Sequence, residues 1–323
     1  MLDLKRLSYL VFGLCFGGGL IWILLREVSI DAAAKALAVV DYRFLLVALA
    51  SYAAAIAVRT LRWRSLLASI APAPYRRVLL VLIIGYAVNA LPPARLGEIV
   101  RADLARSKLG ISRSTALGTI AVERIADGLS VVAMLGIGLM ALPVGAQYGQ
   151  TLRYVLAAAG AVFGLAALLF YLLSGSWQGG STKLFAPLAI RFSKFRDGLR
   201  ILRSPRMIGA ILLTFPVWTA DATSIWFLLR SVHVALSPVQ LLMTVGLVSL
   251  STLLPSAPGY LGTYQLAFVM AVSSFGFASA KGFAAATVSQ TFILGTHCVV
   301  GIGLMLINHV RLSGLLVPAT KPS

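Results

Sequence analysis

Long apolar stretches separated by short polar segments make up most of the chain. They occupy residues 8–25, 43–58, 78–91, 114–142, 152–174, 207–229, 237–254, 262–277 and 282–307. A helix needs about 20 residues to cross the ~30 Å hydrocarbon core of a bilayer, and several of these stretches reach that length. The pattern therefore predicts an all-α polytopic membrane protein.

The composition supports this prediction. Of the 323 residues, 59% are hydrophobic and only 12% are charged, and the mean hydropathy is +0.92. A soluble domain carries roughly 25% charged residues. The formal net charge of +18 would suggest a nucleic-acid partner if the basic residues formed one patch, but they are spread over short segments between the apolar stretches. We therefore expect a single membrane domain over residues 1–323 and no nucleic-acid partner.

The basic segments predict how the chain is oriented. Three segments are rich in arginine and lysine: residues 59–77, 95–113 and 183–206. The positive-inside rule places such segments in the cytoplasm. The first two flank the short stretch 78–91, which is followed by Pro92 and Pro93, and two consecutive prolines stop a helix. We therefore predict a re-entrant hairpin over 78–110 instead of a full crossing.

A second hairpin, over 237–277, implies an internal repeat of about 165 residues. Its turn at 254–262 repeats the Leu-Pro-x-Ala and Leu-Gly elements of residues 91–97. The predicted parts are a first repeat at 43–142, a connecting span at 152–174 and a second, inverted repeat at 207–307. Each repeat is helix, re-entrant hairpin, helix. With an added first helix at 8–25, the prediction is six full spans, two hairpins and both termini in the cytoplasm. The alternative is that the Leu-Pro matches are coincidental loop punctuation.

This architecture is typical of secondary transporters, which hold substrate near the midplane between their repeats. Charged side chains inside spans are the strongest functional candidates, because inserting each costs at least about 2.5–3.5 kcal/mol. Glu123 and Asp127 lie on one helix face, and Arg124 is placed to pair with Asp127. They bind substrate or a coupling ion, or they form an ion pair that pins this helix to a neighbour. Asp221 is the other carboxylate within a span. It pairs with Arg124 or Arg95, or it forms an ion pair whose role is only structural.

The hairpin turns provide the remaining candidates. Arg95 and Glu98 follow the double proline. An arginine at that position offers a bidentate fork to a phosphate, or it extends to the cytoplasmic surface. In the second hairpin, Pro258, Gly259 and Gly262 allow the backbone to approach a headgroup closely. Tyr264 provides a hydrogen-bonding side chain.

Motifs of soluble-enzyme chemistry are absent from the sequence. It has no Gly-Lys-Ser/Thr phosphate loop and no His-Glu-x-x-His, and its cysteines and histidines have no metal-ligand spacing. We therefore expect no catalytic residue, no metal and no cofactor. An intramembrane enzyme that uses Glu123 and Asp127 remains the alternative.

Three ordered motifs closely resemble the lysylphosphatidylglycerol synthase transmembrane-region family of flippase-like membrane proteins. They are Leu91-Pro92-x-x-Arg95-x-Gly97-Glu98, Glu123-Arg124-x-x-Asp127 and Pro258-Gly259-x-x-Gly262, within about residues 40–310. The resemblance implies a lipid-handling membrane domain, which in multi-domain members moves aminoacylated phosphatidylglycerol between leaflets. Relatives are also found beside hopanoid or glycolipid genes.

The sequence differs from the family pattern in two ways, at its C-terminal end and at Gln265. Because this chain stops at Ser323, the resemblance implies no aminoacyl-transferase domain and no synthesis of lysylphosphatidylglycerol. Many relatives carry an acid shortly after the second hairpin's glycine, where this chain has Gln265. This difference argues against proton coupling at that position.

These observations together predict a lipid translocator. It would move an anionic amphipathic lipid (a phospholipid, a polyprenyl-linked lipid or a hopanoid-type lipid) across a bacterial inner membrane. Arg95 and Arg124 would hold the headgroup, and Glu123, Asp127 and Asp221 would neutralise the arginines when the site is empty. The alternative is a non-catalytic membrane accessory that presents lipid to a glycosyl-transferring or other lipid-modifying enzyme.

Overall fold

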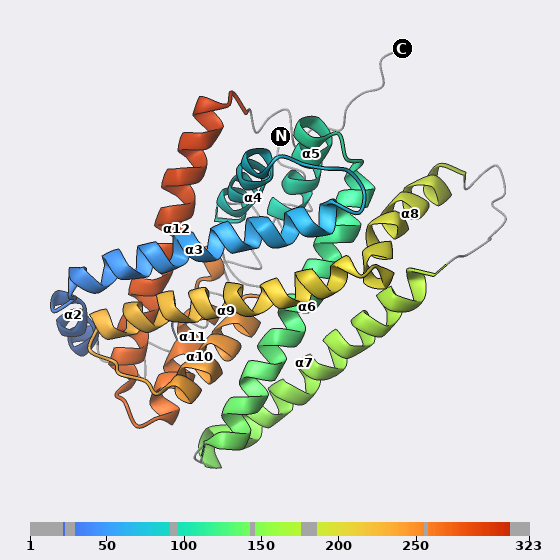
Figure 1. Cartoon of the computed structure of the whole chain (residues 1–323). Helices are drawn as coiled ribbons and strands as arrows, with labels where there is room; N and C mark the ends of the chain where they lie inside the picture. The colour runs from blue at the N-terminus through green and yellow to red at the C-terminus, as the bar shows by residue number, and fades with distance from the viewer. Residues whose placement is uncertain are drawn as a thin grey trace. The chain divides into compact units, whose positions relative to one another are not determined.

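A computed structural model describes residues 22, 30–90, 96–142, 146–175, 186–254 and 258–310. The described residues form helices and connecting turns, and they include no β-strand (Figure 1). The predicted first helix at 8–25, the double-proline turn and Arg95 lie outside the part of the chain that can be described.

Five helices of the described chain are long and apolar enough to cross a membrane. They are α3 (Tyr42–Leu67), α6 (Arg113–Ala141), α7 (Ala146–Leu173), α9 (Arg206–Ser231) and α12 (Ser279–Ile307). Each coincides with a predicted span, so the prediction of a polytopic all-α protein is confirmed. The largest difference is in α3, which the sequence analysis ended at residue 58. It continues to Leu67 because residues 59–67 contain no proline or glycine and include several good helix formers.

Two pairs of short helices occupy the positions of the predicted hairpins. They are α4 (Tyr75–Ala90) with α5 (Gly97–Leu109), and α10 (Pro238–Ser251) with α11 (Thr263–Ser274). The members of each pair pack against each other. The order long, short, short, long therefore occurs twice, as α3 to α6 and as α9 to α12. The re-entrant course of the hairpins and the inversion of the repeats stay predictions.

The remaining helices were not predicted. They are α2 (Ile30–Ala38), α8 (Ala186–Leu199) and the short 3₁₀ helices η2 (Arg200–Arg203) and η3 (Pro258–Tyr260). The segment that contains α8 and η2 lies in the basic segment 183–206, which the positive-inside rule predicts to be cytoplasmic and for which no helix was predicted. Basic side chains are compatible with a helix, so charge alone did not distinguish helix from loop.

The chain divides into two compact units, each with its own apolar core. The first, here called unit 1, comprises residues 1–55, 125–166 and 214–294, and unit 2 comprises residues 56–124, 167–213 and 295–323. Leu135, Met243 and Phe268 are buried in the core of unit 1. Leu82 and Leu104 are buried in the core of unit 2. Each unit takes residues from both predicted repeats.

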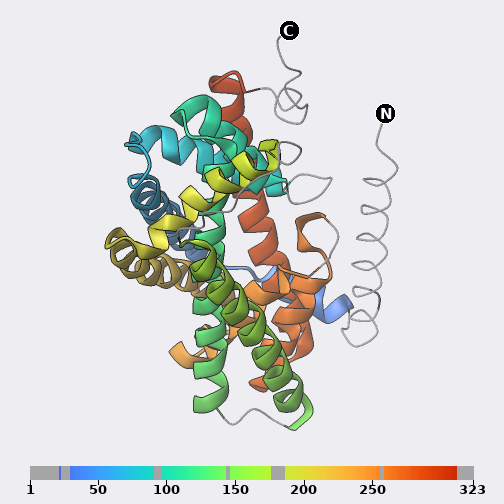
Figure 2. The same cartoon turned by 90° about the vertical axis from the view of Figure 1, so that its right-hand side faces the viewer.

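Close packing of two long helices is visible within unit 1. The parts of α6 and α7 that belong to this unit run side by side (Figures 1 and 2). A Cβ atom added at Gly128 of α6 would lie 2.0 Å from the ring of Phe163 on α7. A larger residue at position 128 would therefore force the Phe163 ring to move.

Candidate functional site

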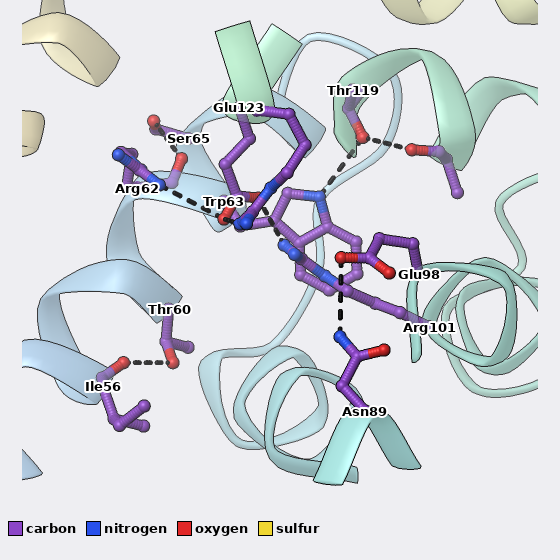
Figure 3. Close-up of polar contacts among 12 residues, drawn as sticks. Ile56, Thr60, Arg62, Trp63, Ser65, Asn89, Glu98, Arg101, Thr119 and Glu123 are labelled. Carbon is purple, nitrogen blue, oxygen red and sulfur yellow. Dashed lines mark hydrogen bonds and ion pairs between the residues drawn. The ribbon is translucent and has the colours of Figure 1, made fainter. Parts of the chain in front are cut away.

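A buried cluster of charged side chains lies in unit 2, centred on Glu123 of α6 (Figure 3). Arg62 of α3 donates a hydrogen bond from Nη2 to Glu123 Oε1 at 3.2 Å. Arg101 of α5 donates from Nη2 to Glu123 Oε2 at 2.6 Å. All three side chains are at most 3% exposed. One carboxylate therefore holds two arginines from two other helices inside an apolar unit.

The helical periodicity of each element explains why these side chains face inward. On α5, Arg101 lies beside Val100, and Leu104 and Ala105 follow one turn later on the same buried face. On α6, Glu123 comes one turn after Thr119, which is fully buried. The charged residues therefore occupy positions that would otherwise belong to the hydrophobic core.

Trp63 fixes the position of the Arg101 guanidinium group. The guanidinium carbon lies 3.8 Å from the centroid of the indole ring, and a cation–π contact of this kind stabilises by about 2 kcal/mol when it is desolvated. The indole Nε1–H donates to Thr119 Oγ1 at 3.2 Å, so the ring itself is held in one orientation. Trp63 is fully buried. The aromatic ring and the carboxylate of Glu123 together leave Arg101 little freedom.

A third arginine completes what we call the arginine–glutamate cluster (Arg62, Arg101, Glu123 and Arg124). Arg124 donates from Nη2 to Glu123 Oε1 at 3.2 Å, and its side chain is 41% exposed. Three arginines thus share one carboxylate, each through its Nη2. Guanidinium groups are well suited to carboxylate and phosphate oxygens, so the cluster fits an anion that approaches from the exposed side of Arg124.

Glu98 and Gly97, at the start of α5, belong to the same unit. Asn89 Oδ1 of α4 accepts a hydrogen bond from the Gly97 backbone N–H at 2.7 Å, and Asn89 Nδ2 donates to Glu98 Oε1 at 3.5 Å (Figure 3). A Cβ atom at position 97 would lie 2.1 Å from the Gly85 carbonyl oxygen. The Gly-Glu pair of the first motif thus serves the close packing of α4 on α5, and it places Glu98 beside Asn89.

The predicted site residues of the second hairpin lie in unit 1, at a turn that side-chain hydrogen bonds hold in place. Gly259 and Gly262 have φ angles of 74° and 89°, which disfavour residues with a Cβ atom. Gln265 Oε1 accepts a hydrogen bond from the Gly262 N–H at 2.8 Å. Gln265 Nε2 donates to Gln290 Oε1, and Gln290 Nε2 donates to the Gly259 carbonyl oxygen. Two carboxamides therefore hold the turn, which gives Gln265 a structural role that an aliphatic residue could not supply.

Asp127, Asp221 and Tyr264 also lie in unit 1. Asp127 on α6 and Asp221 on α9 are each 8% exposed, and Tyr264 on α11 is 6% exposed. The Tyr264 ring packs against Phe268 with the ring centroids 5.1 Å apart. Pro258 begins η3 at the turn itself.

The predicted site residues are thus divided between the two units. Glu98, Glu123 and Arg124 belong to unit 2; the carboxylates Asp127 and Asp221 and the second hairpin belong to unit 1. Five further residues of these two sites lie in basic segments or in apolar stretches without a motif, and the sequence did not single them out. These are Arg62, Trp63, Asn89, Arg101 and Gln290. The unbroken helical composition of residues 59–67, with apolar residues at three- and four-residue spacing, was the signal that could have identified Arg62.

Comparison with known proteins adds three findings. Residues 10–301 match the family model described as the lysylphosphatidylglycerol synthase TM region. The chain is 25% identical over 267 residues to "Glycosyltransferase AglD" of Haloferax volcanii, and the match covers 70% of this chain and 42% of that protein. It is 24% identical over 189 residues to "UPF0104 membrane protein MJ1078" of Methanocaldococcus jannaschii, which covers 56% of this chain and 77% of that protein.

Proposed function

The chain belongs to the lysylphosphatidylglycerol synthase transmembrane-region family, and from this premise we propose that it is a lipid translocator. It moves an anionic amphipathic lipid or lipid-linked intermediate between the leaflets of a bacterial inner membrane, with both termini in the cytoplasm. No chemical reaction is part of this function. The lipid is bound through its phosphate by the arginine–glutamate cluster.

The observation that carries the proposal is the gathering of three arginines around Glu123. Three guanidinium groups share that one carboxylate, and two of them are fully buried. A planar guanidinium group matches a phosphate with two parallel hydrogen bonds, and it keeps its charge when it is buried. Glu123 is then the resident counter-ion of the empty site. A lipid phosphate would accept hydrogen bonds from one or more of the arginines in its place, while the other arginines stay paired with Glu123.

The position of the cluster along α6 supports the same proposal. Glu123 lies about 15 Å along the helix axis from Arg113, at 1.5 Å per residue. In a helix that crosses a ~30 Å core, this position is close to the middle. An anionic headgroup meets its largest solvation cost at that depth, and arginines held there would reduce this cost. Arg124 is the member of the cluster that the headgroup would meet first, because its side chain is 41% exposed.

The test is a translocation assay with purified full-length protein in liposomes. Fluorescent phosphatidylglycerol in the inner leaflet becomes accessible to an impermeant quencher only when it is moved outward. Arg101→Lys keeps the charge but removes the bidentate fork and the stacking on Trp63, so we expect the rate to fall about tenfold or more. The matched control is Arg191→Lys on α8, at an exposed position, which should leave the rate unchanged.

Two results would contradict the proposal. One is a normal rate for Arg101→Lys in protein that elutes as a single species. The other is wild-type protein that moves neither phosphatidylglycerol nor a polyprenyl phosphate.

A second candidate function is a membrane accessory that presents lipid to a glycosyl-transferring enzyme. The observation that favours it is the relative named glycosyltransferase AglD, of which this chain matches 42%. An accessory would bind lipid through the same cluster without moving it between leaflets. Co-purification of a glycosyltransferase activity, together with no translocation by the reconstituted protein, would favour this candidate over the first.

A further inference from the structure

Arg59 is an arginine inside a membrane span, and it is not part of the arginine–glutamate cluster. It lies on α3 eight residues before Leu67, which is about 12 Å from that end of the helix at 1.5 Å per residue. The positive-inside rule alone predicts a cytoplasmic position for this basic segment. Charged side chains are rare inside spans and are usually functional there. Arg59 is therefore a candidate binding residue.

Two ring side chains from other helices lie beside Arg59 within unit 2. The Arg59 guanidinium carbon is 6.0 Å from the centroid of the Tyr86 ring on α4. The His297 ring on α12 packs against the same tyrosine, with the ring centroids 5.4 Å apart and the planes 34° from parallel. Arg59 also acts electrostatically on the His297 imidazole. Side chains from three helices therefore meet at one place.

Close packing of α4 on α12 holds the two rings in place. A Cβ atom added at Gly301 of α12 would lie 2.1 Å from the Ala87 Cβ atom of α4. Gly301 follows His297 by one turn of its helix, and Ala87 follows Tyr86 directly. The two helices are thus in contact at the level of the rings. Groups that are already held in position lose little freedom when a ligand binds them.

The three side chains present hydrogen-bond donors to a ligand. All three are half-buried, whereas Arg62 and Arg101 are buried. The Tyr86 hydroxyl makes no hydrogen bond within the part of the chain that the structure describes. A guanidinium group carries five N–H donors, so it can bind several oxygen atoms at once, and an imidazole adds another N–H.

The chemistry of these donors decides which ligand fits. A cation would be repelled by the charge of Arg59. An apolar group accepts no hydrogen bond from any of the three side chains. A phosphate supplies a negative charge and several acceptor oxygens, and a guanidinium group binds two of these oxygens with parallel hydrogen bonds. The position inside a span favours the phosphate of a lipid, whose acyl chains remain in the hydrocarbon.

We propose that Arg59, Tyr86 and His297 form a second binding site for the phosphate of a lipid headgroup. This inference rests on the proposed function, because it adds a second position at which the same lipid is held. Arg59 precedes Arg62 of the arginine–glutamate cluster by one turn of α3, which separates their Cβ atoms by about 5–6 Å. A headgroup that leaves one site is therefore within reach of the other.

The test detects the ligand at His297 and measures binding instead of translocation. Full-length protein labelled with ¹⁵N-histidine is purified in detergent, and the imidazole NMR signal that is missing from His297→Gln is assigned to His297. Dioleoyl phosphatidylglycerol, dioleoylglycerol and inorganic phosphate are then added separately at constant pH. We expect phosphatidylglycerol to shift the His297 signal saturably. It should do so at concentrations about tenfold or more below those at which the other two act.

Two variants make the test specific. Arg59→Gln removes the charge, and Tyr86→Phe removes only the hydroxyl that makes no hydrogen bond within the described residues. We expect the affinity for phosphatidylglycerol to fall about tenfold or more with Arg59→Gln and about three- to tenfold with Tyr86→Phe. A purely structural account predicts no loss with Tyr86→Phe, because both ring contacts remain. The control Arg153→Gln, at an exposed arginine of α7 in unit 1, should leave the affinity unchanged.

The inference is wrong if phosphatidylglycerol acts on the His297 signal no more strongly than dioleoylglycerol. It is also wrong if inorganic phosphate acts at the same concentrations as the lipid, since the site would then take free phosphate. Wild-type affinity in Tyr86→Phe would equally overturn it. Translocation by protein whose His297 signal does not respond would refute this site and leave the translocator standing. A lipid response at His297 without translocation would support this site and contradict the translocator.

Discussion

Replacing Glu123 by Gln distinguishes a binding site from a structural ion pair. The substitution keeps the shape of the side chain and removes its charge. Glu123 accepts hydrogen bonds from Arg62 at 3.2 Å and from Arg101 at 2.6 Å, in a region where all three side chains are at most 3% exposed. Gln offers one oxygen in place of two, and its amide group would face an arginine donor.

The expected magnitude follows from this geometry. Removing one member of a buried ion pair costs about 3–5 kcal/mol, because the remaining charge is left buried and uncompensated. Glu123→Gln should therefore lower the thermal stability of the purified protein by a large margin. The matched control is Asp103→Asn. The Asp103 ion pair with Arg113 spans 3.1 Å, but the two side chains are 19% and 47% exposed. An exposed pair of this kind contributes about 1 kcal/mol or less.

A lipid titration then separates the two roles. If the cluster binds an anionic headgroup, added phosphatidylglycerol supplies the missing negative charge. It should then raise the Tm of Glu123→Gln more than that of the wild type. Dioleoylglycerol, which has no phosphate, should not have this effect. A Tm for Glu123→Gln close to that of Asp103→Asn would refute the energetic reasoning. A large loss of stability that no anionic lipid restores would favour the structural ion pair over the binding site.

Three further predictions concern the packing and topology. Gly97→Ala should destabilise the protein by about 1–3 kcal/mol or more, because the new Cβ would lie 2.1 Å from the Gly85 carbonyl oxygen. Gly209→Ala, with nothing within 4 Å, should not. Trp63→Leu removes the ring over which the α5 arginine lies at 3.8 Å, and translocation should slow even in protein that remains monodisperse. A cysteine at Arg106, an exposed position, should resist an impermeant thiol reagent applied outside the cell; labelling there would contradict the re-entrant hairpin.

Much of the fold could be predicted because the relevant signals are local. Five apolar stretches became α3, α6, α7, α9 and α12, since a span must be apolar over its own length whatever surrounds it. The paired short helices could likewise be predicted, because the prolines and glycines at their turns end a helix through their own backbone geometry. Glu123 was identified for the same reason, as a charge inside an apolar stretch.

Segments of mixed character were harder to interpret. The basic residues 59–67 and the segment that forms α8 lie outside the apolar stretches from which helices were predicted, although both are helical. Arginine and lysine occur on helices and on loops alike. Their charge therefore predicts which side of the membrane a segment faces better than it predicts secondary structure.

The positions of the spans and turns, and the presence of a carboxylate within the apolar stretch of α6, follow from the order of residues alone. Which residues surround that carboxylate depends on how the helices pack. Arg62 and Arg101 are 61 and 22 residues away from Glu123 along the chain, and no local pattern links them to it. The same is true of Gln290, which lies 31 residues from the glycine whose carbonyl it holds. A span is determined by the hydrophobicity of its own residues, which must suit the lipid around them. Ion pairs and side-chain hydrogen bonds between helices depend on how separate helices pack.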